Sequence, residues 1–394
     1  MTTEQEIRDL HRRVARLESF HEPPLSPLDP IERYWGKWQL AKNLRGYGAW
    51  REKYFKRGGY RDSNSYNAAV VRKALADPSR YATAERSSLR LIYYDRVRIM
   101  QEVAELIESG VTGEEPYYGQ TAGDYRIYRN EAFRWYRDHF IDQFYPRPEY
   151  KQGSEAMPPI RAFPQGLMQL WFRYGDQEAK QMVLDFAQKC AWVRPENAIQ
   201  PPEKDLWREQ GYCLEICICS NILDPGSAPR MKEFLESAIA HSEYNISEVP
   251  PAYKAFQGGI VMNALLLYWR WIEQDPRIPP LVKRFADRAW GYDWLPNRWD
   301  YQVGDWDKYT GERFVYQHPG PGEAYKDNIY SVDNNMLIAP SYAFTWQTTG
   351  DRSYRDKAET IFAAQALHGG TSAPDAYARQ QQQQKIFQQW MGAE

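Results

Sequence analysis

Two helices joined by a tight turn are predicted by the stretch Leu337-Ile-Ala-Pro-Ser-Tyr-Ala-Phe-Thr-Trp-Gln-Thr-Thr-Gly-Asp-Arg-Ser-Tyr-Arg-Asp-Lys-Ala-Glu-Thr-Ile-Phe362. Its first half is largely apolar, which is typical of a helix that is buried on most sides. Gly350 can end this helix in a left-handed turn, and Asp351 can accept hydrogen bonds from the first N–H groups of the next helix. Apolar residues then recur every three or four positions. The stretch therefore predicts a helical hairpin.

The same kind of boundary between two helices is predicted several times along the chain. An Asp follows one apolar helical run and begins another at Asp124, Asp176, Asp224, Asp275 and Asp351. The successive spacings are 52, 48, 51 and 76 residues. The last spacing exceeds the others by about the length of one insertion, so we expect a repeat of about 50 residues with one enlarged loop.

Three helices that precede a repeat Asp begin with a shared dipeptide. These dipeptides are Gln165-Gly166, Gln210-Gly211 and Gln257-Gly258. Because glycine inside a helix costs about 1 kcal/mol relative to alanine, its repeated use predicts that neighbouring helices approach closely at these positions.

In this rhythm the chain resembles the six-hairpin toroid superfamily, the (α/α)6 barrels of many glycoside hydrolases, polysaccharide lyases and sugar epimerases. The hairpin at 337–362 and its echo Arg173-Tyr-Gly-Asp176 carry the resemblance. It implies a mainly α fold, an (α/α)6-type toroid of helical hairpins, formed by residues 29–370 as one domain. The resemblance is specific for fold, and no catalytic motif of any toroid family is carried over with it.

One connection, residues 294–331, is much longer than the ordinary 4 to 6 residues or so. It interleaves Trp, Tyr and Phe with carboxylates and a histidine, a mixture suited to stacking against sugar rings. The alternative is a small β-hairpin between residues 299–303 and 313–317 that caps the helical core. The insertion therefore predicts either a sugar-binding wall or a structural cap.

In such toroids the resemblance implies that substrates bind at a mouth formed by the loops that lead from each outer helix into the next inner one. Here those loops are 145–160, 192–205, 244–256 and 294–331. We expect the 294–331 loop to face residues 207–209 across this mouth. The substrate-binding candidates are Trp207, Arg208, Trp294, Trp306, Tyr316, Tyr330 and Asn334.

Two kinds of chemistry fit the polar residues of the mouth. The catalytic candidates are Glu209, Asp305, Asp307, His318 and Asp333. A glycoside hydrolase needs two carboxyl groups, which Glu209 and one of the aspartates could supply. A polysaccharide lyase or epimerase instead needs a base, His318 or Tyr316, with Asn334 and Arg208 as donors to the anion. An enzyme of one of these classes is favoured; the alternative is a non-catalytic glycan-binding or structural protein on the same scaffold.

No cofactor is expected from the sequence. Asp305 and Asp307 have the spacing of calcium ligands, but the following Lys308-Tyr-Thr-Gly-Glu312 favours a hairpin turn over a calcium loop. Calcium at these aspartates is the alternative. Three of the four cysteines lie in the segment 211–220, where one helix could not present all three to a single metal. We expect these cysteines to be small core residues.

Composition limits the partners. A formal net charge of −2 over 394 residues gives no global attraction to nucleic acid or to an anionic membrane. Nucleic acid is therefore not expected, and a glycan is. No apolar run reaches the length of a membrane span, and the first residues lack a signal peptide's apolar core, so we expect a cytoplasmic product. Incorporation into a particle or surface assembly is the alternative location.

Both ends of the chain look like attachment segments. Residues 1–28 combine heptad spacing with a Pro-rich linker, which predicts homo-oligomerisation through the N-terminal helix. Residues 371–394 are Gln-rich and group Trp390 and Met391 with two further apolar side chains near the end. This segment is predicted to form a helix that latches onto the body or onto a neighbour.

Overall fold

The computed structural model describes residues 95, 97–98, 101, 104, 122–135, 137, 162–189, 199, 201–202, 206–247, 254–295, 313–314, 334–368 and 390–391. This part of the chain is mainly α-helical, as the sequence predicts. Its helices are α7 (Ala122–Trp135), α8 (Pro164–Tyr174), α9 (Gln177–Lys189), α10 (Trp207–Leu223), α11 (Met231–Asn245), α12 (Ala255–Trp271), α13 (Ile278–Arg288), the π-helix η6 (Ala289–Asp293), α14 (Asn335–Thr349) and α15 (Arg352–His368). Two short strands complete the list: β1 (Trp294–Leu295) and β2 (Arg313–Phe314).

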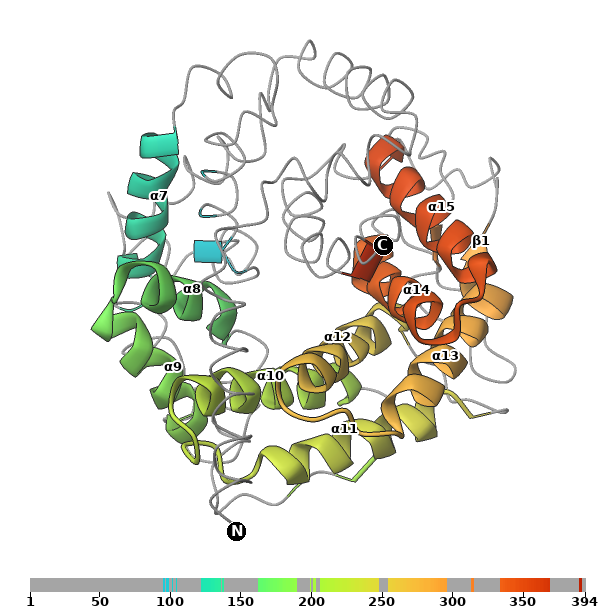
Figure 1. Cartoon of the computed structure of the whole chain (residues 1–394), viewed down its shortest axis with the longest axis horizontal. Coiled ribbons are helices and arrows are strands. Elements are labelled where there is room, and N and C mark those ends of the chain that lie inside the picture. Colours follow the sequence, from blue (N-terminus) through green and yellow to red (C-terminus); the bar gives the residue numbers. More distant parts are fainter. Residues whose placement is uncertain are drawn as a thin grey trace, which may run out of the picture.

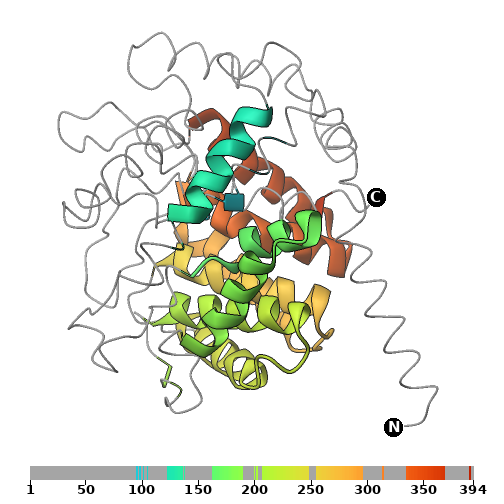
Figure 2. The same ribbon diagram turned by 90° about the vertical axis from the view of Figure 1, so that its left-hand side faces the viewer.

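The described helices follow an arc with an inner and an outer side. Helices α8, α10, α12 and α14 lie on the inner side, while α9, α11, α13 and α15 lie outside them (Figure 1). After a 90° turn the described helices form one column in the middle of the picture, with α7 (teal) near its top and α11 (yellow-green) at its bottom (Figure 2). Each inner helix packs against the inner helix that follows it and against the outer helices behind it. The hydrophobic core lies between these two layers.

Four of the five repeat Asp residues lie between an inner and an outer helix. The carboxylates of Asp176, Asp275 and Asp351 accept hydrogen bonds from N–H groups two or three residues further on, at 2.9–3.0 Å. Asp224 directly follows α10. These turns confirm the predicted boundaries between helices. Asp124 differs because it already lies in the first turn of α7.

The glycines of the Gln-Gly dipeptides lie where helices meet. A Cβ atom on Gly211 would lie 2.9 Å from the Cα atom of Val261 in α12. One on Gly259 would lie 2.4 Å from the carbonyl oxygen of Leu337 in α14. At Gly258 the neighbours are the rings of Trp207 and Phe285 instead. The predicted close approach of backbones is confirmed at Gly211, where α10 meets α12, but not at Gly258; the close contact between α12 and α14 is made by Gly259, which follows the dipeptide.

The start and the middle of the long insertion are anchored to the core. Strands β1 and β2 are antiparallel, with Trp294 opposite Phe314. The Trp294 ring stacks on Trp290 at 5.0 Å between ring centres, and Phe314 stacks on Tyr342 of α14 at 6.2 Å. The predicted hairpin is thus seen at 313–314, but its partner strand is 294–295. Residues 296–312 and 315–333, which include the predicted strand 299–303, lie outside the described residues.

The end of the chain contacts α14. The Trp390 ring meets the Phe344 ring edge-on at 4.8 Å, and the Gln347 side chain donates a hydrogen bond to the Trp390 carbonyl at 2.6 Å. Met391 is buried in the core. The predicted latching of the C-terminal segment is observed at these two residues. The N-terminal segment 1–28, and with it the predicted oligomer contact, lies outside the described residues.

The cysteines of α10 are core residues. Within the described residues Cys213, Cys217 and Cys219 form no disulfide, and all three are fully buried, as expected for small apolar side chains. Cys190 lies outside the described residues. No helix within the described ranges has the length and apolar character needed to cross a membrane.

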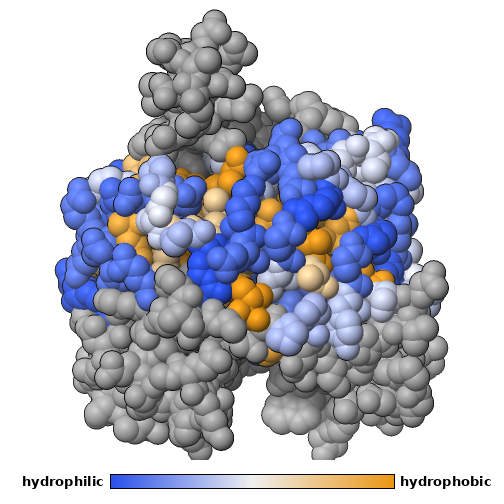
Figure 3. All heavy atoms as spheres, turned by 90° about the horizontal axis from the view of Figure 1, so that it is seen from below, coloured by the Kyte–Doolittle hydropathy of each residue, from blue (hydrophilic) through white to orange (hydrophobic). Residues whose placement is uncertain are grey.

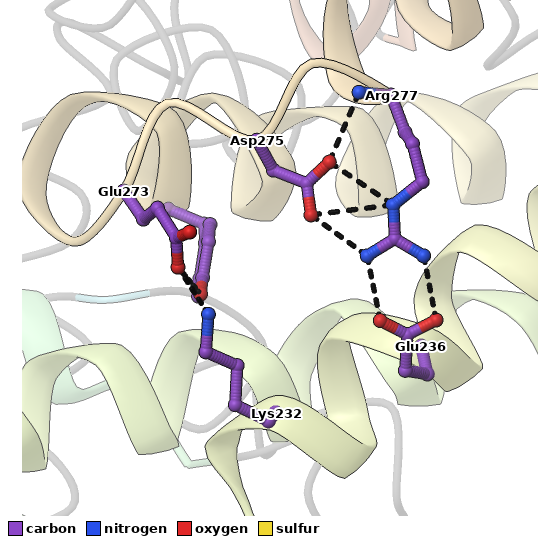
Figure 4. Close-up of polar contacts among 6 residues, drawn as sticks. Lys232, Glu236, Glu273, Asp275 and Arg277 are labelled. Carbon is purple, nitrogen blue, oxygen red and sulfur yellow. Dashed lines mark hydrogen bonds and ion pairs between the residues drawn. The ribbon is translucent and has the colours of Figure 1, made fainter.

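Ion pairs join α11 to the next hairpin. Lys232 pairs with Glu273, and Glu236 pairs with Arg277, which also binds Asp275 at 2.7 Å (Figure 4). A further pair and a side-chain hydrogen bond to a carbonyl continue the series along α13, and four of these contacts join residues 41 positions apart. Because the separation is constant, α11 and the segment through α13 run side by side in the same direction.

From the side of α11, most of the described surface is hydrophilic, with small separate apolar areas (Figure 3).

Candidate functional site

Helix α10 keeps one accessible stripe on its inner side. Arg208, Tyr212 and Glu215 are half-buried, whereas the residues between them are buried. Their i, i+4, i+7 spacing places them within about 60° around the helix. Trp207 and Gln210 point the other way, since their side chains hydrogen-bond serines of the outer helix α11. The stripe therefore faces away from the outer layer.

Glu215 is held by a chain of polar side chains. The Gln165 amide nitrogen, on α8, donates to Glu215 Oε1 at 2.9 Å. The guanidinium of the buried Arg98 donates in turn to the Gln165 amide oxygen. Arg98, Gln165 and Glu215 therefore form one hydrogen-bonded row, in which Gln165 of α8 links Arg98 to Glu215.

A buried aspartate fixes the start of this row. The Asp95 carboxylate accepts from the backbone N–H of Arg98 at 3.0 Å and from that of Gly166 at 2.8 Å. It therefore caps two chain segments at once. A Cβ atom at position 166 would lie 2.3 Å from the Asp95 carboxylate, so the site requires glycine there. The first turn of α8 is in this way locked to Asp95 and Arg98.

The surroundings of Glu215 change its acidity. Burial raises its pKa from the ordinary 4.5 to about 7, and the Asp95 charge acts in the same direction. The Gln165 hydrogen bond and the Arg98 charge oppose the rise. At neutral pH both protonation states of this carboxyl are therefore populated, and the residue as a whole is half-buried. A carboxyl with these two properties can act as a general acid or a general base.

The neighbouring thiol has no comparable role. Cys219 lies one helical turn beyond Glu215, and burial raises its pKa well above the ordinary value, with the Glu215 charge adding to the effect. Since the thiolate is the nucleophilic form, Cys219 stays unreactive at neutral pH. Proton transfer by Glu215 is the chemistry that this cluster offers.

The predicted site residues at the start of α10 separate onto different faces. Arg208 lies on the accessible stripe. Glu209 is buried, about 100° further round the helix, and its carboxylate accepts from Arg208 Nε at 2.8 Å. Trp207 is fully buried: its ring meets Phe285 edge-on at 6.0 Å and its N–H donates to Ser242. In this structure Trp207 therefore serves helix packing.

The other described candidates lie at the base of the insertion. Trp294 is buried in the aromatic cluster around β1, and Asn334 is buried directly before α14. The predicted facing of residues 207–209 by the insertion stays a prediction, because the insertion itself is not described. Asp305, Asp307, His318, Asp333, Trp306, Tyr316 and Tyr330 lie outside the described residues.

Sequence reasoning missed Glu215 and its partners. A signal was present, because Glu215 is the one charged residue in the segment 211–220 of an otherwise buried helix. Among the described residues, no group of three metal-ligating side chains comes together.

Comparisons with protein-family models, with curated proteins and with solved structures find no match to this chain. The geometry of the site is therefore the basis for the function proposed below.

Proposed function

We propose that this protein is an enzyme that acts on a glycan by general acid–base catalysis, as a glycoside hydrolase or a polysaccharide lyase. The observation that carries the proposal is Glu215, a half-buried residue on the inner side of the helical arc whose carboxyl has a pKa of about 7. In the proposed architecture the arc closes into an (α/α)6-type toroid. Its inner helices α8, α10, α12 and α14 then line the interior.

The stripe on α10 supplies three different groups. Protonated Glu215 donates its proton to the leaving oxygen of a glycosidic bond, and ionised Glu215 removes a proton from a sugar carbon or from water. Tyr212 offers an aromatic ring one turn away, suited to stacking on a sugar face. Arg208, at the first turn of α10, offers charged donors towards the side where the loops enter. These roles favour a glycan that lies along the stripe.

A hydrolase needs a second carboxyl group, and a lyase needs donors for the anion. The aspartates and His318 of the insertion are the proposed sources of the second group. The insertion begins at β1, its strand β2 has Phe314 stacked on Tyr342 of α14, and α14 follows it in the chain. Its aromatic side chains would extend the sugar-binding surface.

The test is a screen of polysaccharides and synthetic glycosides with two readouts. New reducing ends report hydrolysis or cleavage, and ultraviolet absorbance of unsaturated products reports elimination. We expect turnover of at least one glycan, and a fall in kcat of about 10²- to 10⁴-fold for Glu215→Gln. The matched variant is Glu209→Gln, on the same helix but off the stripe.

The outcomes are distinct. If Glu209→Gln abolishes turnover and Glu215→Gln keeps it, the proposed acid is wrong. Retention of a glycan by the protein without any turnover would instead support the non-catalytic binding alternative and refute the enzyme.

A further inference from the structure

The orientation of the Gln165 amide follows from its neighbour. A guanidinium can only donate hydrogen bonds, so the group of Gln165 that faces Arg98 must be its oxygen. The amide nitrogen then necessarily faces Glu215, where it donates to Oε1 at 2.9 Å. If the Gln165 side-chain amide rotated by 180°, its N–H groups would face the guanidinium, which has no acceptor for them. Arg98 therefore determines what Gln165 presents to the carboxyl.

We propose that Gln165 and Arg98 are positioning residues that keep Glu215 Oε1 as a hydrogen-bond acceptor and assign the transferable proton to Oε2. The carbonyl oxygen of a protonated carboxyl is a stronger acceptor than its hydroxyl oxygen, so the Gln165 N–H favours the state in which Oε1 is the carbonyl oxygen and the hydrogen is on Oε2. The inference rests on the proposed function for the identity of the proton acceptor. The orientation of the carboxyl itself does not depend on that function.

The O–H bond at Glu215 Oε2 breaks, a new O–H bond forms on the departing oxygen, and Glu215 is left as a carboxylate. The Gln165 N–H stabilises that carboxylate directly. The Arg98 charge stabilises it indirectly, because Arg98 binds the Gln165 amide oxygen. Water restores the proton afterwards.

The groups that set the proton affinity come from three elements. Arg98 lowers the pKa of Glu215 and Asp95 raises it, both from the segment that includes residues 95–104. Gln165 on α8 lowers it by hydrogen bonding. Cys219, on the same helix as Glu215, stays a neutral thiol at ordinary pH. Removal of the Gln165 donor should therefore raise the pKa.

The experiment follows the Glu215 carboxyl directly by carbon-13 NMR titration of the full chain, with the signal assigned through Glu215→Gln. Wild type is compared with Gln165→Met, which removes the amide at similar volume. Gln169→Met is the matched control: Gln169 lies one turn further along α8, is equally half-buried, and makes no side-chain hydrogen bond to a described residue. We expect the Glu215 midpoint to rise by about one pH unit or more in Gln165→Met and to stay in place in the control.

A second variant guards against loss of folding. Gln165→Glu keeps an acceptor for Arg98 but replaces the donor facing Glu215 by another carboxyl, so the midpoint should rise at least as far. In an active enzyme the matching limb of the pH–rate profile should move with it. An unchanged midpoint in both variants, with native circular dichroism, would overturn the inference.

This result and the proposed function can fail separately. A shifted midpoint in a protein that turns over no glycan would keep the positioning role and refute the enzyme. Turnover that is lost in Glu215→Gln but unchanged in Gln165→Met would support the enzyme and refute the positioning role of Gln165.

Discussion

Glu215 is costly to the folded protein whenever it is ionised. In the unfolded chain its pKa is near 4.5, and in the folded protein it is about 7. Between these values the folded state binds more protons than the unfolded state, so stability falls as pH rises. The cost is absent below about pH 4.5 and complete above about pH 7, where it amounts to at most ~3 kcal/mol. Such a cost is typical of residues kept for function rather than for stability.

This cost can be measured by urea unfolding of wild type and Glu215→Gln at two pH values. At pH 8 the variant should be the more stable protein, because it removes a desolvated charge, by up to ~3 kcal/mol. At pH 4 the two midpoints should nearly coincide, since Glu215 is then protonated in the folded protein and mostly protonated in the unfolded chain. A variant that is less stable at pH 8 would mean that the attraction to Arg98 outweighs the burial cost.

At the scale of helices, the inner side of the arc depends on glycine. Gly259 lies against the Leu337 carbonyl of α14, and Gly211 lies against α12. Asn263 reinforces the first contact by donating to the same Leu337 carbonyl at 3.1 Å. The contacts require that no side chain stand between the helices, which outweighs the low helix propensity of glycine.

Alanine substitution separates these two effects. Gly259→Ala should destabilise the protein by about 1 to 3 kcal/mol, because the new methyl group would overlap the neighbouring backbone. Gly291→Ala is the matched control, since its Cβ would meet no atom within 4 Å. The control should be neutral or gain up to about 1 kcal/mol from helix propensity. Thermal unfolding at one pH compares them, and equal effects of the two substitutions would contradict the packing argument.

At the scale of the whole molecule, successive hairpins are joined on the outside by ion pairs in constant register. Arg277 binds Glu236 with both terminal nitrogens and Asp275 as well (Figure 4). Its hydrogen bonds are the main cause that lowers the pKa of both carboxyls. Their contribution is therefore present above the ordinary carboxyl pKa values and is lost as pH falls through the lowered ones.

Removal of Arg277 should show that one guanidinium stabilises both carboxylates, those of Glu236 and Asp275. Arg277→Ala should cost about 1 kcal/mol at low salt, and less in 1 M NaCl, because the pairs are largely exposed. Arg284→Ala breaks the single exposed pair with Glu243 on the same seam and should cost only a few tenths of a kcal/mol. Urea midpoints at low and high salt give both values. Equal losses for the two variants would show that Arg277 gains nothing from its second carboxylate.

The features that sequence alone determined are local ones. Asp176, Asp275 and Asp351 were recognisable because an aspartate can satisfy N–H groups only two or three residues away. The Gln-Gly dipeptides pointed to close helices because glycine is unfavourable inside a helix without such a contact. Periodicity and capping act over one or two turns, so a single sequence carries them in full.

Tertiary structure alone decided which polar residues form the candidate site. Glu209 and Glu215 lie on the same helix, yet one faces away from the accessible stripe and the other faces Gln165, which is 50 positions earlier in the chain. The pKa of Glu215 depends on water excluded by distant segments and on charges contributed by Asp95 and Arg98. Likewise Trp207, expected at a binding mouth, packs on Phe285. Desolvation and long-range contacts arise only when remote segments meet, so no local pattern encodes them.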